Sequence, residues 1–443
     1  MEKSCKIQYT HSTGVYFFMS IGRPGTGVAL YMGRGRDGER EPEPAKKGRV
    51  YMKYDFDQVI DRSQNRSSKY DERVQNFGTD QVIPLWVADM DFRTAQPIID
   101  ACVKKAEEGI WGYTSRPASY FEAVKEWEKK RNDWDVDTSL MSWSLGVVPA
   151  LSALVKLYTE DGDKVMIQTP VYPEFYDVTE AWGRQVVENQ LVEENGGWHV
   201  DFEDFEAKAK DEKVKVFLLC SPHNPLGIVW KPEELKKMAE ICIANDVLLV
   251  SDEIHSDLIF HGKKHTPTAK ISPEIASKIV TCVSATKTFN LAGLQASTTI
   301  FPNMEMKKQF DRFWMNMDIH RNNAFSSVAM EAAYREGEEW LEQLLEYISG
   351  NFDFVKEYCD KYIPRIKPNV PDATYLVWLD CRDLGMTNEE LKNFMVYKAG
   401  LGLNEGWKFG RSLTGFMRLN VACPRSVLEK ALGQLRDAVD SLS

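Results

Sequence analysis

The sequence predicts an α/β fold, in which a large domain with a mostly parallel, doubly wound sheet is joined to a smaller α+β domain. Three observations support this prediction. The chain has 443 residues, enough for two domains. Short β-branched runs alternate with amphipathic segments through its middle, which is typical of a parallel sheet covered by helices. From about residue 330 onward, long amphipathic helices precede mixed segments.

Residues 1–51 differ from the rest of the chain. They contain the stretches GRPGTG and GRGRDGEREPEPAKKGR, and they show no sustained hydrophobic period of 2 or 3.6 residues. We expect a disordered extension here. Neither glycine cluster follows a strand and opens a helix, as a phosphate-binding fingerprint would require. The composition becomes globular at Met52, which we expect to be the natural start of the protein.

The next part of the chain alternates between helical and strand patterns. Residues 95–109 (AQPIIDACVKKAEEG) have apolar side chains at helical spacing and stop at Gly109. Pro149 lies near the first turn of a second helix, PALSALVKLY. The strand predictions are KVMIQT (164–169), KVKVFLLC (213–220), DVLLVS (246–251) and KIVTCVS (278–284).

The tail of the chain has a different pattern. The segment SSVAMEAAYREGEEWLEQLLEYI predicts long amphipathic helices, and TYLVWLD and GFMRLNVA are mixed segments beyond it. We therefore expect a large domain over residues 96–327, and a small domain composed of residues 52–95 and 328–443.

Polar or aromatic residues follow four of the predicted strands. They are Tyr172, then Asn224, then Asp252 with His255, and finally Ser284 with Lys287. In open α/β sheets, ligands bind at the carboxyl ends of the strands, so these residues are predicted to line one crevice. Taken singly, each has an ordinary explanation as a solvated lysine, a turn, a helix cap or a buried polar group. Their occurrence in order favours a cofactor site.

Pyridoxal 5'-phosphate (PLP) is the cofactor that suits this set. Lys287 can form a Schiff base with its aldehyde, and Asp252 can pair with its pyridine nitrogen so that the ring acts as an electron sink. Asn224 can donate to the phenolate oxygen, and Tyr172 can stack on the ring. His255 is assigned to the same site.

The phosphate of this cofactor requires hydrogen-bond donors. The stretch SLGVVPALSALV supplies backbone N–H groups at a helix N-terminus, from Gly146, Val147 and Val148. The hydroxyl of Ser284 is predicted to add another donor. With this cofactor, residues 96–327 become the PLP-binding domain.

At these residues the chain resembles the fold-type I PLP enzymes of the aminotransferase class I/II superfamily. Within that superfamily it is similar to the carbon–sulfur β-lyase branch that includes MalY, PatB and cystalysin. The resemblance covers roughly residues 52–443. It rests on FDQVIDR, IPLWVADMDF, GVVPALS, TPVYPEF, SPHNPLG, SDEIHSDL, SATKTFNLAGLQ, ATYLVWLD and GFMRLNVACPRSVLEKAL.

The resemblance also implies roles for two further residues. Arg418 in GFMRLN matches the arginine that binds the substrate α-carboxylate, a bidentate task suited to guanidinium. Tyr113 in GIWGYTS matches a tyrosine that reaches the partner subunit's phosphate site, which implies a homodimer with shared active sites. Many superfamily members carry arginine eight residues after the lysine, where this chain has Gln295.

The activity implied by the resemblance is β-elimination from a sulfur-containing amino acid. Cystathionine would yield homocysteine, and the aminoacrylate that is released would hydrolyse to pyruvate and ammonia. An aminotransferase is an alternative, because it uses the same Lys, Asp and Arg. An enzyme-like regulatory binding protein is another. A serine acyl enzyme matching S-x-x-K at Ser284–Lys287 lacks the accompanying S-D-N and K-T-G motifs.

Composition excludes other classes of partner. The formal charge of -11 argues against nucleic acid. No apolar run approaches the roughly 20 residues that span a bilayer, and the histidines form no metal-binding pattern. Eight cysteines without a CxxC pair favour a cytoplasmic setting. The partners that the resemblance implies are an amino-acid substrate and a second copy of the chain.

Overall fold

The computed structural model describes residues 8–10, 16–20, 29–33, 54–194 and 196–442. Residues 1–52 and 53–443 form two compact units. In the first, an antiparallel sheet contains β1 (Gln8–Thr10), β2 (Tyr16–Ser20) and β3 (Ala29–Gly33). The remainder of the predicted extension (residues 1–51) and Met52 lie outside the described residues, so the disorder of the extension and the start at Met52 remain predictions.

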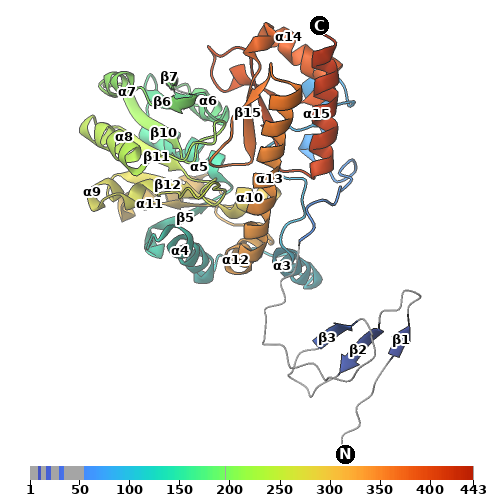
Figure 1. Ribbon diagram of the computed structural model, residues 1–443. Helices are drawn as coiled ribbons and strands as arrows, with labels where there is room; N and C mark the ends of the chain where they lie inside the picture. The colour runs from blue at the N-terminus through green and yellow to red at the C-terminus, as the bar shows by residue number, and fades with distance from the viewer. Residues whose placement is uncertain (1–7, 11–15, 21–28, 34–53, 195, 443) are drawn as a thin grey trace, which may run out of the picture. The chain divides into compact units, whose positions relative to one another are not determined.

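A seven-stranded sheet forms the centre of the second unit (Figure 1). Its spatial order is β5-β13-β12-β11-β10-β6-β7, and only β13 runs antiparallel to its neighbours. The strands are β5 (Met141–Ser144), β6 (Lys164–Thr169), β7 (Gln185–Gln190), β10 (Val214–Cys220), β11 (Leu248–Asp252), β12 (Ile279–Val283) and β13 (Ser297–Ile300). The mostly parallel sheet is confirmed, and the four predicted strands are β6, β10, β11 and β12.

Helices cover both faces of this sheet. Along β10, Val216 and Leu218 pack in one apolar cluster with α5 (Val147–Tyr158), α6 (Glu174–Glu180) and α11 (Met304–Asn316). Phe217 and Leu219, which alternate with them, pack with α7 (Phe202–Ala209) and α8 (Pro232–Ala244). Because side chains alternate across a strand, this division shows that both faces are buried, as a doubly wound fold requires.

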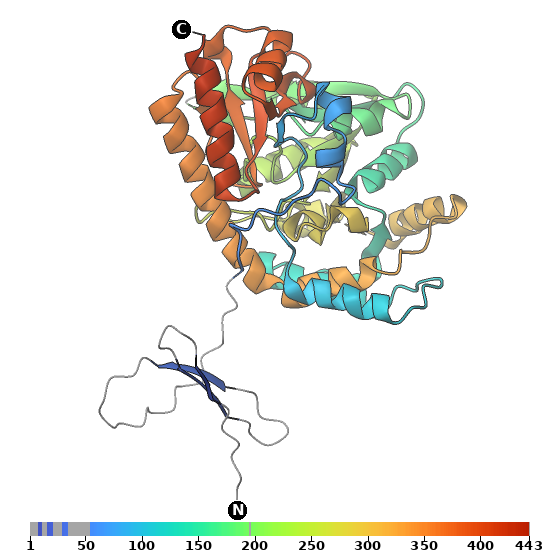
Figure 2. The same ribbon diagram turned by 90° about the vertical axis from the view of Figure 1, so that its right-hand side faces the viewer.

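A second sheet is formed from the tail of the chain. It has four antiparallel strands in the order β14-β15-β18-β17. They are β14 (Lys367–Pro368), β15 (Leu376–Asp380), β17 (Asn404–Glu405) and β18 (Phe416–Asn420). The long helices α13 (Glu338–Tyr362) and α15 (Arg425–Asp440) lie side by side next to it (Figures 1 and 2). The tail is therefore α+β, as predicted, while the proposed domain boundaries remain a prediction.

The predicted helical run at 326–348 is divided into two helices. α12 (Ser326–Glu336) ends before Gly337, and α13 begins at Glu338. A Cβ at Gly337 would lie 2.4 Å from the Phe289 ring and 2.5 Å from the Ala333 carbonyl. The glycine therefore permits a close approach that no other residue would allow.

The remaining elements are short or peripheral. α3 (Gln96–Glu107) and α4 (Ala118–Asn132) pack against α12. β4 (Ile83–Pro84) pairs in parallel with β16 (Leu401–Gly402), and β8 (Val192–Glu194) forms a hairpin with β9 (Gly197–His199). Short helices are α1 (Ser68–Asp71), α2 (Arg73–Phe77), α9 (Pro273–Ala276), α10 (Ala285–Thr288) and α14 (Asn388–Asn393). Among the described helices, none is both long and apolar enough to span a membrane.

Candidate active site

One cavity lies at the carboxyl ends of the central strands. It brings together most of the residues predicted to form the site, because β6, β10 and β11 end there and α5 begins there. The predicted residues that line it are Gly146, Val147, Val148, Tyr172, Asn224, Asp252, His255 and Lys287.

Lys287 lies in α10, the short helix that follows β12. Its Nζ donates a hydrogen bond to the Ala88 carbonyl at 2.6 Å. Burial lowers the pKa of the Lys287 amine, and the nearby Arg418 guanidinium lowers it further. Both effects disfavour the ammonium form, so more of this amine is neutral and nucleophilic than in a solvated lysine.

Asp252 is the last residue of β11 and is 3% exposed. One carboxylate oxygen accepts a hydrogen bond from the Ile254 N–H at 3.1 Å, and the carboxylate forms no ion pair with any described residue. Burial raises its pKa to about 7. A cationic partner in the cavity would therefore stabilise the carboxylate form.

Asn224 and Arg418 are joined by a hydrogen bond. Arg418 Nη1 donates to Asn224 Oδ1 at 3.0 Å, while its Nη2 donates to Asn404 Oδ1 at 2.7 Å and to the Trp86 carbonyl at 3.0 Å. Burial lowers the Arg418 pKa to about 10, and no described carboxylate pairs with this guanidinium. The Asn224 Nδ2 donates no hydrogen bond to a described group, so it remains available to a ligand.

Tyr172 and His255 contribute rings to the cavity. Burial raises the Tyr172 pKa well above its usual value, with a further contribution from the neighbouring Glu174 carboxylate. Burial lowers the His255 pKa to about 3. His255 is therefore neutral near pH 7, and its Nδ1 has no hydrogen-bond partner among the described groups.

The N-terminus of α5 opens onto the cavity. Gly146, the N-cap residue, has a φ of 149°, a conformation that favours glycine. The N–H groups of Val147 and Val148 have no acceptor within the helix, because they belong to its first turn. They are suited to bind an anion, and the helix dipole adds to that preference.

Three predicted residues are not among those that line this cavity: Arg418, Ser284 and Tyr113. Arg418 is joined to the lining residue Asn224 by its hydrogen bond. The Ser284 hydroxyl caps α10 by accepting from the Thr286 N–H at 3.1 Å, and it donates to the Ala296 carbonyl at 2.7 Å. Its predicted hydrogen bond to a phosphate remains a prediction. Tyr113 is 92% exposed on a surface loop, and its ring lies 5.1 Å from the Arg321 guanidinium.

Sequence reasoning assigned no role to several groups at the site. Ala88, Thr286 and Gln295 line the cavity, and the Tyr375 hydroxyl donates to the Ala88 carbonyl at 2.8 Å. The stretch WVADMDF belongs to the resemblance, but nothing in a sequence indicates which backbone carbonyl will meet a lysine. Gln295 was singled out as a departure from the superfamily, without a position in the site.

The residues present fit PLP. Asp252 is a buried carboxylate without a cationic partner, which suits a protonated pyridine nitrogen. The start of α5 suits a phosphate, Lys287 suits an aldehyde and the free Asn224 Nδ2 suits a phenolate oxygen. Arg418 has a buried guanidinium without an acid partner, which suits a substrate carboxylate.

Comparison with known proteins agrees with this geometry. The chain is 41% identical to "Cystathionine beta-lyase PatB" of Bacillus subtilis (strain 168), over 87% of this chain and 99% of that protein. It is 30% identical to "Protein MalY" of Escherichia coli (strain K12), over 87% and 99% of the two chains. The structure of cystalysin from Treponema denticola, which contains PLP, matches with a TM-score of 0.86 at 36% identity, over 88% of this chain and 100% of that one.

A family model provides the assignment. The model described as aminotransferase class I and II matches residues 81–435. This range includes every residue predicted to form the site, and the family predicted from the sequence motifs is confirmed. The chain belongs to the aminotransferase class I and II family.

Proposed function

We propose that the protein is a PLP-dependent carbon–sulfur lyase that acts on amino acids with sulfur on the β-carbon, such as cystathionine, to give pyruvate, ammonia and a thiol. One observation carries the chemical part of the proposal: the buried Asp252 carboxylate and the Lys287 amine, whose pKa is lowered, line the same cavity. The 41% identity to a cystathionine beta-lyase favours elimination over transamination.

Each of the proposed site residues has a separate role in this reaction. Bound PLP supplies an electron sink for the electron pair left at Cα when its proton is removed. Asp252 keeps the ring nitrogen protonated, because a buried carboxylate without another cation favours that proton. The neutral amine of Lys287 would remove the Cα proton of the substrate.

Arg418 orients the substrate by binding its α-carboxylate. Its guanidinium is held by Asn404 and by the Trp86 carbonyl, so its direction is fixed before the substrate arrives. The bond to Asn224 connects this carboxylate site to the group proposed to bind the ring oxygen. Thiolate then leaves from the β-carbon as the electron pair at Cα forms a double bond.

A homodimer with shared active sites is part of the proposal. The surface loop that carries Tyr113 also exposes Ile110 and Trp111, which are 78% and 64% exposed. Three large apolar side chains within four residues are typical of a surface covered by a partner. In the dimer, Tyr113 of one subunit is proposed to contact the phosphate bound by its partner. A cytoplasmic setting and the division into two domains are proposed with it.

The deciding experiment measures pyruvate release from L-cystathionine by the cofactor-loaded protein, without any keto acid. Pyruvate together with a stoichiometric amount of thiol would support the lyase. Product that appears only when a keto acid is supplied would identify an aminotransferase. No turnover under either condition would favour the enzyme-like binding protein.

A further inference from the structure

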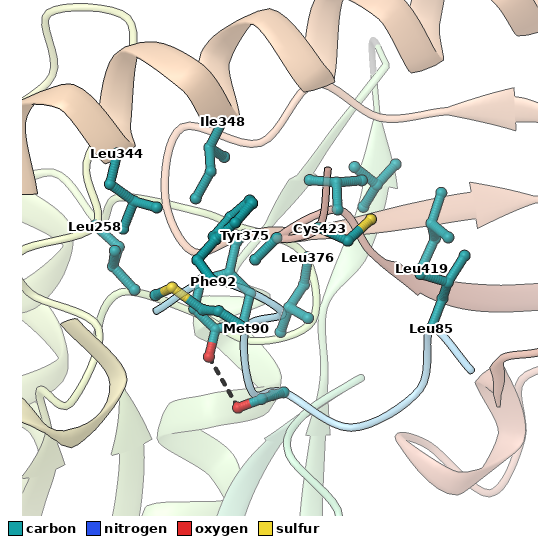
Figure 3. Close-up of a cluster of buried hydrophobic side chains, with 14 of the residues drawn as sticks. Leu85, Met90, Phe92, Leu258, Leu344, Ile348, Tyr375, Leu376, Leu419 and Cys423 are labelled. Carbon is teal, nitrogen blue, oxygen red and sulfur yellow. Dashed lines mark hydrogen bonds between the residues drawn. The ribbon is translucent and has the colours of Figure 1, made fainter. Parts of the chain in front are cut away.

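Residues 86–92 (WVADMDF), called the strap here, lie at the edge of the active-site cavity. Ala88, near the middle of the strap, lines the cavity. Its carbonyl accepts two hydrogen bonds, one from Lys287 Nζ at 2.6 Å and one from the Tyr375 hydroxyl at 2.8 Å. In Figure 3 the dashed line marks the bond of Tyr375, whose ring lies beside Met90 and Phe92 of the strap. One backbone oxygen thus joins the lysine to a tyrosine.

We propose that Tyr375 is a positioning residue for the Lys287 amine and that it acts through the Ala88 carbonyl. This inference rests on the proposed function, because it concerns Lys287 after it has been released from the cofactor. A carbonyl oxygen has two lone pairs and only accepts hydrogen bonds. The Tyr375 hydroxyl occupies one, and the other fixes the place of the amine.

The hydrogen bond from Lys287 Nζ to the Ala88 carbonyl is compatible with the amine acting as a base. A neutral amine that donates one N–H to the carbonyl keeps its own lone pair free, and that lone pair takes the Cα proton. After the transfer, the resulting ammonium still donates to the same oxygen. The Ala88 carbonyl can therefore hold the base in one position before and after the proton moves, and a well-placed base is what general base catalysis requires.

Tyr375 is suited to this role because its own position is fixed. It is 1% exposed, and its ring contacts His255 edge-on, with a centroid separation of 6.3 Å. Burial raises the pKa of its hydroxyl. The phenol therefore remains protonated across the working pH range and serves as a donor to the carbonyl.

The rest of the strap is anchored independently of Tyr375. Asn420 Nδ2 donates to the Val87 and Asp89 carbonyls at 2.7 and 2.6 Å. Asn290 Nδ2 donates to the Met90 carbonyl at 3.0 Å and to the Phe92 carbonyl at the same distance. Loss of the Tyr375 hydroxyl should thus release the Ala88 carbonyl without unfolding the strap.

Two carboxylates of the strap, the buried Asp91 and the partly buried Asp89, reinforce this anchoring. Asp91 pairs with Arg62 at 2.7 Å and with Lys69 at 2.8 Å, and Asp89 pairs with Arg62 at 2.9 Å. Lys69 is fully buried. These ion pairs fix the strap against the segment that precedes it, so the effect expected of Tyr375 is local to Ala88.

The test is Tyr375→Phe in the full chain, with Tyr397→Phe as the matched control. Tyr397 also donates from its hydroxyl to a backbone carbonyl, that of Phe77 at 3.2 Å, but it lies outside the site. The holoenzyme is assayed for kcat and KM with L-cystathionine. The cofactor-free protein is mixed with PLP, and the rate at which a borohydride-reducible linkage to Lys287 forms is measured.

We expect Tyr375→Phe to lower kcat about tenfold with KM changed less than about twofold, since the base is displaced while Arg418 still binds substrate. The linkage should form several-fold more slowly, and Tyr397→Phe should match the wild type. Unchanged kcat and linkage rate in Tyr375→Phe would overturn the proposal. So would a rise in KM alone, which would place Tyr375 in substrate binding.

The two readouts separate this inference from the proposed function. If wild-type protein released no pyruvate while Tyr375→Phe still slowed formation of the linkage, the lyase assignment would fail and the positioning role would stand. If wild-type protein formed pyruvate and the variant matched it in both readouts, the positioning role would fail alone. Lys287→Ala must abolish the linkage in either case.

Discussion

The pKa of Asp252 makes a quantitative prediction about stability. In the cofactor-free protein, burial raises the pKa of this carboxyl from 3.8 to about 7. The folded state therefore holds a proton that the unfolded chain loses near pH 4. The stabilising contribution of that proton is complete below the unfolded pKa of 3.8 and is lost as pH rises through about 7. Asp252→Asn removes this titration and retains the size of the side chain.

The size of this effect on the free energy of unfolding follows from the folded and unfolded pKa values of Asp252. Since one pKa unit corresponds to about 1.36 kcal/mol, the full shift contributes roughly 4 kcal/mol to the free energy of unfolding. Between about pH 5 and pH 7.5, the wild-type protein should lose roughly 2 to 3 kcal/mol of this stabilisation. Asn cannot ionise, so the free energy of unfolding of the variant should fall by roughly 2 to 3 kcal/mol less than that of the wild type over the same interval. Glu128, whose pKa burial raises to about 8, titrates in both proteins and cancels in the comparison.

The assay is urea unfolding of cofactor-free wild type and Asp252→Asn at the two pH values. The difference between their pH dependences isolates Asp252. Bound PLP should reduce the wild-type dependence, because a protonated ring nitrogen would stabilise the carboxylate. Parallel pH dependences for the two cofactor-free proteins would refute the reasoning, since they would mean that the Asp252 carboxyl does not hold a proton near neutral pH.

Three further predictions concern charged side chains. Lys287→Ala should abolish both turnover and the borohydride-reducible linkage, as seen by intact mass; full activity would remove the assigned role. Arg418→Ala should raise KM about a hundredfold, because losing a buried carboxylate partner costs about 3 kcal/mol; an unchanged KM would exclude carboxylate binding. Lys69→Met should lower the unfolding free energy by about 3 kcal/mol, since it leaves the buried Asp91 with one cation. Lys129→Met, which breaks an exposed pair with Asp133, is its control and should unfold like the wild type.

The sequence predicts that Asn224, Asp252 and Lys287 share one cavity because each lies at or just beyond the end of a parallel strand. Asp252 ends β11, and Asn224 and Lys287 follow β10 and β12, which are its neighbours in the sheet. The short β-branched runs of the sequence predict the strands. Because ligands bind at the carboxyl ends of such strands, these residues are predicted to lie close together. The antiparallel β13 was not predicted, since STTI is too short to reveal its direction.

The substrate side was less accessible to sequence reasoning. Arg418 was assigned by resemblance alone, and its bond to Asn224 joins positions 194 residues apart. The Ala88 carbonyl meets Lys287 across 199 residues and Tyr375 across 287. Every residue has a backbone carbonyl, so composition and spacing cannot indicate which one a lysine will contact. Only the pairing of distant segments in the folded chain determines it.

The residues of the site therefore come from two parts of the fold, and the contacts between these parts have a mechanistic consequence. The central sheet positions Asp252 and Lys287, whereas β18 and the strap position Arg418 and the Ala88 carbonyl. Arg418 also holds the strap directly, through the Trp86 carbonyl, and meets Asn224 at the end of β10. With the proposed role of Arg418, a substrate carboxylate would contact a group that holds both the strap and the proposed ring ligand. Substrate binding and the placement of the base would then be coupled through one guanidinium, so a substitution at Arg418 is expected to lower kcat as well as raise KM.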